Sequence, residues 1–280
     1  ANPQACGGKA KIVLDNYVKF LKKNEVSFYP YKTTLDKDKE TISTLIKLKK
    51  FKTISILGGD GTINIAINSL PHLDFNIHII PAGSGNDMAK MIYKNLSMTQ
   101  IFELILNPNR DHVLVDIWKC NQRRFSNGFG AGFDGLVAHR MFKKSYLFPT
   151  VLKYWFEILR VIVGYRSKMI EVNGEEHPLF MVAAANGRVY GGSFNVAPEA
   201  SINDGLLDIV KIKKVHMFWR FFYLPKVQKG KHIGLKVIDY HQENKITLSS
   251  TEKFHAHIDG EPILESVYHL IFDGKIRALA

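Results

Sequence analysis

The fold can be predicted from the stretch Leu57-Gly58-Gly59-Asp60-Gly61-Thr62, because it joins a short apolar run to a helical pattern. Thr53–Leu57 predicts a buried strand, and Thr62–Leu70 predicts a helix. Three glycines within four positions let the backbone approach a ligand closely, and the N–H groups at a helix start favour phosphate. A carboxylate pointing inward would repel phosphate, so we expect Asp60 to handle a metal ion, directly or through water. A simple tight turn with Asp60 as helix cap is the alternative.

A second glycine-rich loop, Pro81-Ala82-Gly83-Ser84-Gly85-Asn86-Asp87, follows the next strand pattern, Ile77–Ile80. It also opens a helical pattern, Asn86–Tyr93, and places Asp87 among groups that favour phosphate. Turns after neighbouring parallel strands lie at the same carboxyl edge of the sheet, which is where open α/β folds bind ligands. The two loops together therefore predict a phosphate-binding edge. Neither loop is a P-loop, since the chain has no GxxxxGK[ST] motif.

The residues around these loops alternate between helix and strand patterns up to about position 115. Strands that alternate with helices predict a parallel sheet with helices on its faces. The further helices are expected at Ala10–Leu21, Glu40–Lys49 and Thr99–Leu106, the last ended by Asn107-Pro108, and a further strand is expected at Val26–Tyr31.

From about Val113 the pattern becomes rich in short strands. Asn173-Gly174 and Asp273-Gly274 are hairpin signals, so this half is predicted to be mostly antiparallel. We expect two domains, a nucleotide-binding α/β domain at 1–117 and an acceptor domain at 118–272, with a last strand near 273–280 returning to the first. The strands are expected at Val113–Lys119, Arg123–Phe129, Lys168–Val172, Leu179–Ala185, Leu206–Ile212, Ile233–Val237, Lys245–Ser249, Phe254–Ile258 and Tyr268–Phe272, with helices near Leu147–Val163 and Val215–Lys226.

Three further patterns in the second half carry candidate chemistry. Gly130–Gly135 matches GxGxxG, but it lies outside the first βαβ unit, so we interpret it as a chance dinucleotide match. His255 and His257 share one face of a strand without an evident third metal ligand, so a satisfied surface or core role is favoured over a metal site. Ile258-Asp259-Gly260-Glu261-Pro262 places two carboxylates after a strand, which suits general-base work, although a polar turn is the alternative.

The composition favours anionic partners. The 280 residues carry a formal charge of +12, which fits nucleotides or an anionic membrane surface, and no nucleic-acid-binding module is evident. The two cysteines, Cys6 and Cys120, suggest a reducing, cytosolic setting, and no signal peptide is visible. Tyr146–Tyr165 is too charged to span a membrane, because Lys153, Glu157 and Arg160 form one polar stripe on it. It is expected either to pack against a sheet or to rest on a membrane surface.

The motifs together resemble the diacylglycerol kinase catalytic family, and within it the soluble bacterial lipid kinases. The resemblance covers nearly the whole chain. GGDGT alone is shared with NAD kinases and sphingosine kinases, but its order with PAGSGND and IDGE is specific to lipid kinases. The motifs that carry the resemblance are Asn2-Pro3, Gly58–Thr62, Pro81–Asp87 with Ala89, Asp116, Asn127–Asp134, Ala197 with Asp204-Gly205-Leu206, Gly230-Lys231-His232 and Ile258–Glu261.

The resemblance implies a fold and a reaction. The fold is an N-terminal α/β domain with a parallel sheet, of the NAD kinase and diacylglycerol kinase type, followed by a C-terminal, mainly antiparallel β-sandwich domain. The reaction is transfer of the γ-phosphate of ATP, with Mg²⁺, to a lipid hydroxyl, most directly that of diacylglycerol. The implied partners are ATP and a membrane lipid, with a cytoplasmic location, peripheral membrane contact and no nucleic acid. A homodimer is left open.

The resemblance also implies roles for single residues. Asp259 would be the general base, assisted by Glu261, and Asp60 would share in catalysis. Asp60, Asp87 and Asp116 would organise the catalytic magnesium through water, while Asp204 and the Leu206 carbonyl match a second, structural magnesium region. The nucleotide would be held by Asn2, Gly58, Gly59, Asp60, Gly61, Thr62, Gly83, Ser84, Gly85 and Asn86.

The sequence departs from the family pattern at two places. Ile65 follows Asn64 where the family has a glutamate, which removes any contact of that glutamate to ribose or to a magnesium-bound water. Only Ala1 precedes Asn2, where the family has a strand, so we expect the sequence to begin inside the native protein. Two alternatives stay open. One is a related kinase acting on phosphatidylglycerol, undecaprenol, a sphingoid base or NAD. The other is a non-catalytic nucleotide- or lipid-binding relative.

Overall fold

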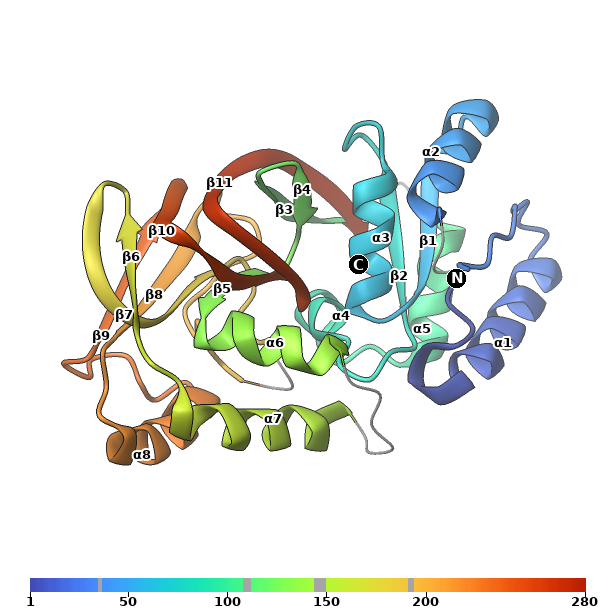
Figure 1. Ribbon diagram of the computed structural model, residues 1–280. Helices are drawn as coiled ribbons and strands as arrows, with labels where there is room; N and C mark the ends of the chain where they lie inside the picture. The colour runs from blue at the N-terminus through green and yellow to red at the C-terminus, as the bar shows by residue number, and fades with distance from the viewer. Residues whose placement is uncertain (35–36, 108–111, 144–149, 191–193) are drawn as a thin grey trace. The chain divides into compact units, whose positions relative to one another are not determined.

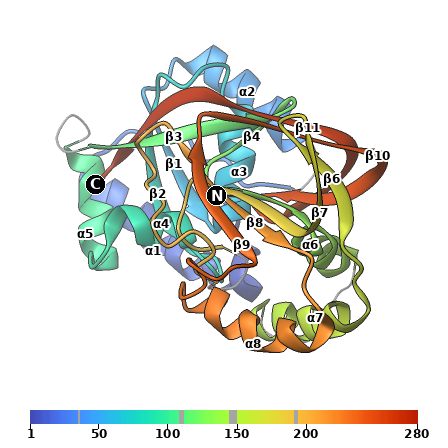
Figure 2. The same cartoon turned by 90° about the vertical axis from the view of Figure 1, so that its left-hand side faces the viewer.

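The computed structural model describes residues 1–34, 37–107, 112–143, 150–190 and 194–280. The chain forms two compact units. Unit 1 comprises Ala1–Ile117 and Gly274–Ala280, and unit 2 comprises Trp118–Asp273. Figures 1 and 2 show the elements of each unit from two directions. Two strands, β3 (His112–Cys120) and β11 (Glu261–Leu279), contain the points at which the chain passes from one unit to the other.

Unit 1 is built on a parallel sheet. β1 (Thr53–Gly58) pairs in parallel with β2 (Asn76–Pro81), and β2 pairs in parallel with the end of β11. Both strands bury their carboxyl halves, where Leu57 and Ile80 join one apolar core. The helices are α1 (Ala10–Lys23), α2 (Asp38–Lys49), α3 (Asp60–Ser69), α4 (Asp87–Tyr93) and α5 (Met98–Glu103), with short 3-10 turns at Ala5–Gly8 and Leu104–Leu106.

Unit 2 is a mainly antiparallel β structure with helices on one side. Its strands follow the order β11-β10-β5-β7-β8-β9, and β6 pairs with both β10 and β7, so four strands close around an apolar core. A second core lies between the sheet and the helices. The remaining elements are β4 (Arg123–Phe125), β5 (Gly128–Gly132), α6 (Phe133–Lys143), α7 (Thr150–Gly164), β6 (Lys168–Val172), β7 (Glu175–Ala185), β8 (Leu207–Lys213), α8 (Met217–Gln228), β9 (Ile238–Glu243) and β10 (Lys245–Ile258).

The fold class predicted from the sequence is confirmed, since an α/β unit with a parallel sheet precedes a mainly antiparallel β unit. The Asn173-Gly174 hairpin is also confirmed, because both residues have positive φ between β6 and β7, as a tight hairpin turn requires. The strands predicted at Lys245–Ser249 and Phe254–Ile258 are one strand, β10, with a register shift between Ser249 and Phe254.

Three predicted elements are wrong, because the backbone of each segment pairs differently from what its sequence pattern predicts. Val26–Tyr31 forms no strand, and its neighbourhood pairs only briefly with Ala1 through the Thr33 N–H and the Tyr31 carbonyl. Ile233–Val237 lies in turns, and the strand that pairs with β8 begins at Ile238. Asp273-Gly274 lies inside β11 and makes no hairpin.

The helix around Tyr146–Tyr165 differs from the prediction in its polar face. α7 begins at Thr150, and residues 146–149 and the Lys153 side chain lie outside the described residues. Glu157 is fully buried rather than part of a solvent-facing stripe, whereas Arg160 is exposed. The same limit applies to Pro108 after α5 and to the predicted helix start at Leu147. Among the described residues, no helix has both the length and the apolar character needed to cross a bilayer.

Candidate active site

The two glycine-rich loops of unit 1 lie against each other at one edge of the sheet. Gly58 is in register with Pro81, and the Ala82 N–H donates to the Gly58 carbonyl at 2.9 Å. A Cβ atom added to Gly83 would lie 2.3 Å from the Cα atom of Gly59. Glycine is therefore required at this contact because the two backbones touch, whereas the sequence analysis expected the glycines to allow close approach to a ligand.

Asn86 closes the second loop. Its φ of 58° lies in the left-handed region, which asparagine tolerates better than most residues. Its side-chain Oδ1 accepts the Gly83 N–H at 2.8 Å, and its Nδ2 donates to the Gly83 carbonyl at 2.9 Å. This local closure leaves Ser84 exposed at the tip of the loop, where a phosphate could reach it.

Asp60 connects the two loops. Its carboxylate accepts the N–H groups of Asp87 and Met88, both at 3.2 Å, so it caps the N-terminus of α4 from the start of α3. Asp87 is itself buried, and burial, followed by the nearby charge of Asp60, raises its pKa, although Lys90 at 3.4 Å opposes this shift. Two carboxylates thus share a small volume beside Gly85, whose added Cβ would lie 3.0 Å from Asp60 Oδ2.

The Asp60–Asp87 pair fits a magnesium ion by its chemistry. Mg²⁺ prefers one or two carboxylates and keeps several waters, and a cation would relieve the repulsion that raises the pKa of Asp87. Asp116, the third predicted ligand, is fully buried in β3 and forms an ion pair with Lys275 at 3.1 Å. Within the described residues, no three His, Cys, Asp or Glu side chains gather as a metal cluster. Of the three predicted ligands of the catalytic magnesium, Asp60 and Asp87 are therefore the two that the structure brings together.

The other predicted nucleotide residues lie at the same edge of unit 1. The Asn2 N–H donates to the Leu57 carbonyl at 2.9 Å, so Asn2 lies beside the end of β1. Thr62 is buried with its hydroxyl against Gly58, where an added Cβ would approach Oγ1 to 2.2 Å. Gly61 is exposed, and an added Cβ there meets nothing within 4 Å. Gly61 consequently presents open backbone at the start of α3.

Asp259 in unit 2 is held by the backbone. Asp259 and Gly260 both have positive φ and form the two-residue turn between β10 and β11. The Asp259 carboxylate accepts the N–H groups of Ser126 at 3.1 Å, Asn127 at 3.0 Å and Gly128 at 2.9 Å. Three such donors stabilise the ionised form of a carboxylate and fix its orientation. Glu261, two residues further, forms an ion pair with Arg123 of β4.

A buried network behind this turn was missed by the sequence analysis. His257 Nε2 lies 2.8 Å from Asp134 Oδ2, and Tyr154 donates its hydroxyl proton to Asp134 Oδ1 at 2.8 Å. With Nε2 protonated, His257 accepts the Gly260 N–H at Nδ1, at 3.3 Å. Burial alone would raise the pKa of Asp134, but its interactions with His257, together with the hydrogen bond from Tyr154, hold the pKa below the usual value. The alternation of His255 and His257 was the available sequence signal, and it indicated a satisfied surface or core role without identifying Asp134 as the partner of His257.

The predicted second magnesium region is a local turn in the structure. The Leu206 N–H donates to Asp204 Oδ1 at 3.0 Å, and Gly205 between them has a positive φ of 76°. Asp204 lies near Asp208, whose pKa is raised by burial first and then by neighbouring carboxylates. Asp208 accepts the Tyr240 hydroxyl at 2.5 Å. The Leu206 carbonyl and the Asp204 carboxylate therefore lie within one short turn.

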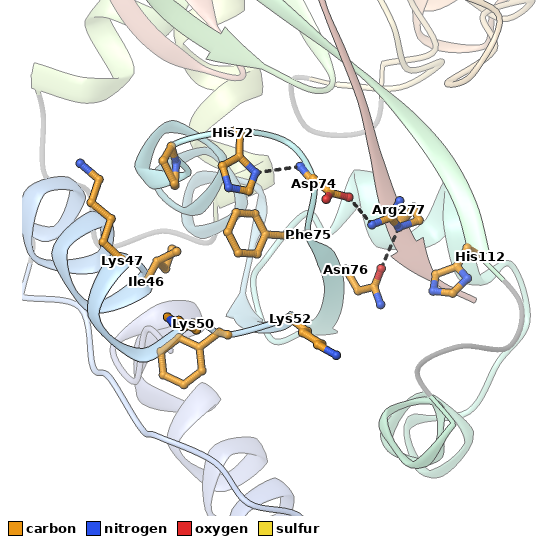
Figure 3. Close-up of a pocket in the computed structure, with 12 residues that line it drawn as sticks. Ile46, Lys47, Lys50, Lys52, His72, Asp74, Phe75, Asn76, His112 and Arg277 are labelled. Carbon is orange, nitrogen blue, oxygen red and sulfur yellow. Dashed lines mark hydrogen bonds and ion pairs between the residues drawn. The ribbon is translucent and has the colours of Figure 1, made fainter.

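Each unit also has a hollow lined by described residues. Unit 2 contains a small apolar cavity of about 60 Å³ between its sheet and its helices, lined by side chains such as Ile158, Phe180 and Leu224, with Asp134 among the lining residues. Unit 1 has an open hollow of about 710 Å³ at the opposite ends of β1 and β2, between Lys52 and Asn76 (Figure 3). It is lined by the exposed cations Lys47, Lys50, Lys52 and Arg277, and Arg277 forms an ion pair with Asp74 at 2.5 Å.

Two family models match the chain in succession. Residues 1–117 match the diacylglycerol kinase catalytic domain. Residues 128–269 match the YegS C-terminal NAD kinase beta sandwich-like domain. Together the two matches cover most of the chain in the order predicted from its motifs.

Curated relatives and solved structures agree with these matches. A diacylglycerol kinase of Bacillus subtilis is 27% identical over 230 residues, covering 76% of this chain and 72% of the relative. A protein of Shewanella frigidimarina named a probable lipid kinase of the YegS-like type is 27% identical over 225 residues, covering 75% and 70%. Two Bacillus anthracis crystal structures share the fold with TM-scores of 0.78 and 0.69 at 21% and 19% identity, each covering 99% of this chain and 94% of the other. The second of these is described as a diacylglycerol kinase.

Proposed function

The chain belongs to the lipid kinase family in which a diacylglycerol kinase catalytic domain is followed by a YegS-type C-terminal domain, and we propose that it transfers the γ-phosphate of ATP to the hydroxyl of diacylglycerol. The observation that carries the proposal is the pair of interlocked glycine loops that bring Asp60 and Asp87 together at one sheet edge. The product of this reaction would be phosphatidic acid.

Unit 1 would bind the nucleotide. The exposed backbone at Gly61 and Ser84 and the helix starts behind both loops suit the oxygens of a triphosphate, because N–H groups and helix N-termini stabilise negative charge. Asp60 and Asp87 would hold Mg²⁺, which supplies positive charge for the phosphate oxygens. Asn2, beside the end of β1, would contact the nucleotide at the same edge.

Asp259 would accept the proton of the acceptor hydroxyl. Phosphoryl transfer depends on positioning and charge stabilisation more than on a strong base, so a carboxylate oriented by three N–H groups suits the role. Its fixed orientation would also hold the proton acceptor in place for the acceptor hydroxyl. Glu261, which forms an ion pair with Arg123, would assist by neutralising the charge of that arginine beside the turn.

The acceptor side of the proposal draws on the relatives. The curated proteins that this chain resembles are named kinases of diacylglycerol or of lipids, which favours an acceptor with hydrocarbon chains over a soluble acceptor such as NAD. Phosphatidylglycerol, undecaprenol and sphingoid bases share this apolar character. We therefore propose a membrane lipid as acceptor and peripheral attachment to the membrane that contains it. The two unpaired thiols, Cys6 and Cys120, fit a cytoplasmic location.

The decisive assay is transfer of labelled γ-phosphate from ATP, with Mg²⁺, to a panel of lipids in mixed micelles. We expect label in the diacylglycerol fraction, and loss of that label with Asp259→Asn. NAD serves as the soluble acceptor control. Label on another lipid would support the lipid kinase proposal and assign that lipid as the acceptor in place of diacylglycerol. Label on NAD alone would contradict the proposal.

A further inference from the structure

The first two turns of α8 expose large apolar side chains. All five are between 42% and 58% exposed, whereas Val227 near the other end of the helix is buried. A contiguous exposed apolar patch on a soluble fold marks a surface that binds a partner or a membrane. The five residues are Met217, Phe218, Trp219, Phe221 and Phe222.

α7 extends the same patch. Four of its apolar side chains are at least half exposed and follow the spacing i, i+4, i+7, i+11, which places them on one helix face. Figures 1 and 2 both show α7 and α8 side by side along one side of unit 2. Together with the five residues of α8, these four form what we name the α7–α8 surface; they are Leu152, Phe156, Leu159 and Val163.

Arg220 holds the two helices together. Its Nη1 donates to the carbonyls of Ile162 at 2.6 Å and Tyr165 at 2.8 Å, at the C-terminal end of α7. Its guanidinium also lies over the Phe180 ring, 4.8 Å from the ring centroid. Because Arg220 belongs to α8, these contacts fix both helices as one surface without using its exposed apolar side chains.

The chain around α8 is rich in cations. Residues 209–238 contain no Asp or Glu, Asp239 directly after them pairs with Lys211 at 2.7 Å, and the one carboxylate of α7, Glu157, is fully buried. Two copies of this chain meeting at the α7–α8 surface would bring these cations together and repel each other. Anionic phospholipid headgroups would instead complement them. The eight cations are Lys211, Lys213, Lys214, Arg220, Lys226, Lys229, Lys231 and Lys236.

We propose that the α7–α8 surface inserts into the headgroup region of a bilayer that carries anionic phospholipids. The apolar side chains enter the boundary between headgroups and acyl chains, and the surrounding lysines contact the headgroups. Trp219 lies at the interface, where tryptophan is favoured. The inference rests on the proposed function only in that the acceptor is taken to reside in the same bilayer.

Trp219 allows a direct test, because the other two tryptophans differ from it in exposure. Trp118 is fully buried and Trp155 is half-buried, whereas Trp219 is 52% exposed. Vesicles of phosphatidylcholine with phosphatidylglycerol, added without nucleotide, should shift the emission to the blue. Brominated acyl chains should quench it. Trp219→Phe should lose both signals while the protein still sediments with the vesicles.

Paired variants test the apolar and charged parts separately. Phe218→Ser with Trp219→Ser should lower vesicle partitioning at least tenfold, since each removes a large apolar side chain that would be buried in the bilayer. Leu48→Ser, at a 71% exposed position of α2, is the matched control and should change nothing. Lys213→Gln and Lys214→Gln should each lower vesicle partitioning about fivefold, and only on anionic vesicles. Lys22→Gln with Lys23→Gln, exposed at the end of α1, is the charge control.

Three results would overturn the inference. One is the absence of vesicle binding, and another is equal loss in the variants and their controls. The third is a concentration-dependent dimer that the α8 variant abolishes while vesicle binding is absent, which would assign the surface to a second copy. Activity on short-chain diacylglycerol in detergent micelles should survive Phe218→Ser with Trp219→Ser. A failure of the lipid kinase proposal would appear in that assay alone and leave the vesicle result unaffected.

Discussion

Asp87 in unit 1 lies buried beside a second carboxylate, whereas Asp259 in unit 2 accepts three backbone N–H bonds. At Asp87, burial and the charge of Asp60 disfavour the ionised form of the carboxyl group. At Asp259, the backbone N–H groups favour the ionised form. The contrast separates two uses of a carboxylate in one enzyme. The neighbouring carboxylates of Asp60 and Asp87 are suited to binding a cation, whereas the carboxylate of Asp259 is fixed in one orientation by its hydrogen bonds. The same substitution, Asp to Asn, should therefore have opposite effects on stability at the two places.

Asp259→Asn should give the largest loss of turnover, about 10²–10⁴-fold, because a proton acceptor is removed. The new amide group would also face an N–H donor, which should lower the free energy of unfolding by about 1–3 kcal/mol. Steady-state kinetics with chemical denaturation measures both changes. ATP affinity should stay unchanged. Normal turnover with reduced stability would make Asp259 a structural residue only.

Asp60→Asn should lower kcat/KM about 10²–10³-fold, because one of two charges that would hold the cation is lost. An asparagine oxygen can still accept an N–H at the start of α4, so the fold should persist. Titration of activity with Mg²⁺ checks this, and the half-saturating concentration should rise. Asp15→Asn, exposed on α1, is the matched control. An unchanged Mg²⁺ requirement would remove Asp60 from the metal site.

Much of the unit 1 site follows from local sequence. A strand, a glycine turn and a helix are close together in the chain, so Gly58–Thr62 and Pro81–Asp87 could be predicted at one edge. What could not be predicted is the contact between the loops: Asp60 caps α4, 27 residues away, rather than its own helix. The sequence also could not show that Asp116 pairs with Lys275, because that ion pair joins distant parts of the chain.

Long-range pairing also explains the misses in unit 2. Asp259 meets Ser126–Gly128 across more than 130 residues, and the hydrogen bond of His257 to Asp134 spans 123. Asp273-Gly274 has the composition of a turn, yet Asp273 is held by Lys119 and Arg124, and Gly274 absorbs the backbone change at φ 135° within β11. α6 was missed because Gly130–Gly135 is rich in glycine, which disfavours a helix, although the helix begins at Phe133 within this stretch.

A pair of glycine substitutions sharpens the difference between packed and open backbone at the loop edge. Gly83→Ala should destabilise the fold by about 1–3 kcal/mol, since its Cβ would lie 2.3 Å from Gly59 Cα and force the loops apart. Gly61→Val should leave stability nearly unchanged, because a Cβ atom added there meets nothing within 4 Å, yet weaken ATP binding. Thermal unfolding and ATP titration separate the two outcomes. Unchanged ATP affinity in Gly61→Val would place the phosphates elsewhere.

Asp87→Asn should have the smallest effect on the fold, and that effect should be a gain. The pKa of Asp87 is raised by burial and by Asp60, so the folded protein binds this proton more tightly than the unfolded chain, and the ionised form costs stability above the raised pKa. Removing the charge should raise the Tm at neutral pH, and the gain should vanish as the pH falls through the raised value toward about 4. Added Mg²⁺ should raise the Tm of the unmodified protein at neutral pH, but not that of the variant. Thermal unfolding across pH, with and without Mg²⁺, tests both effects. A variant that is less stable at neutral pH would mean that Asp87, like Asp259, is held by favourable bonds, and the contrast between the two units would fail.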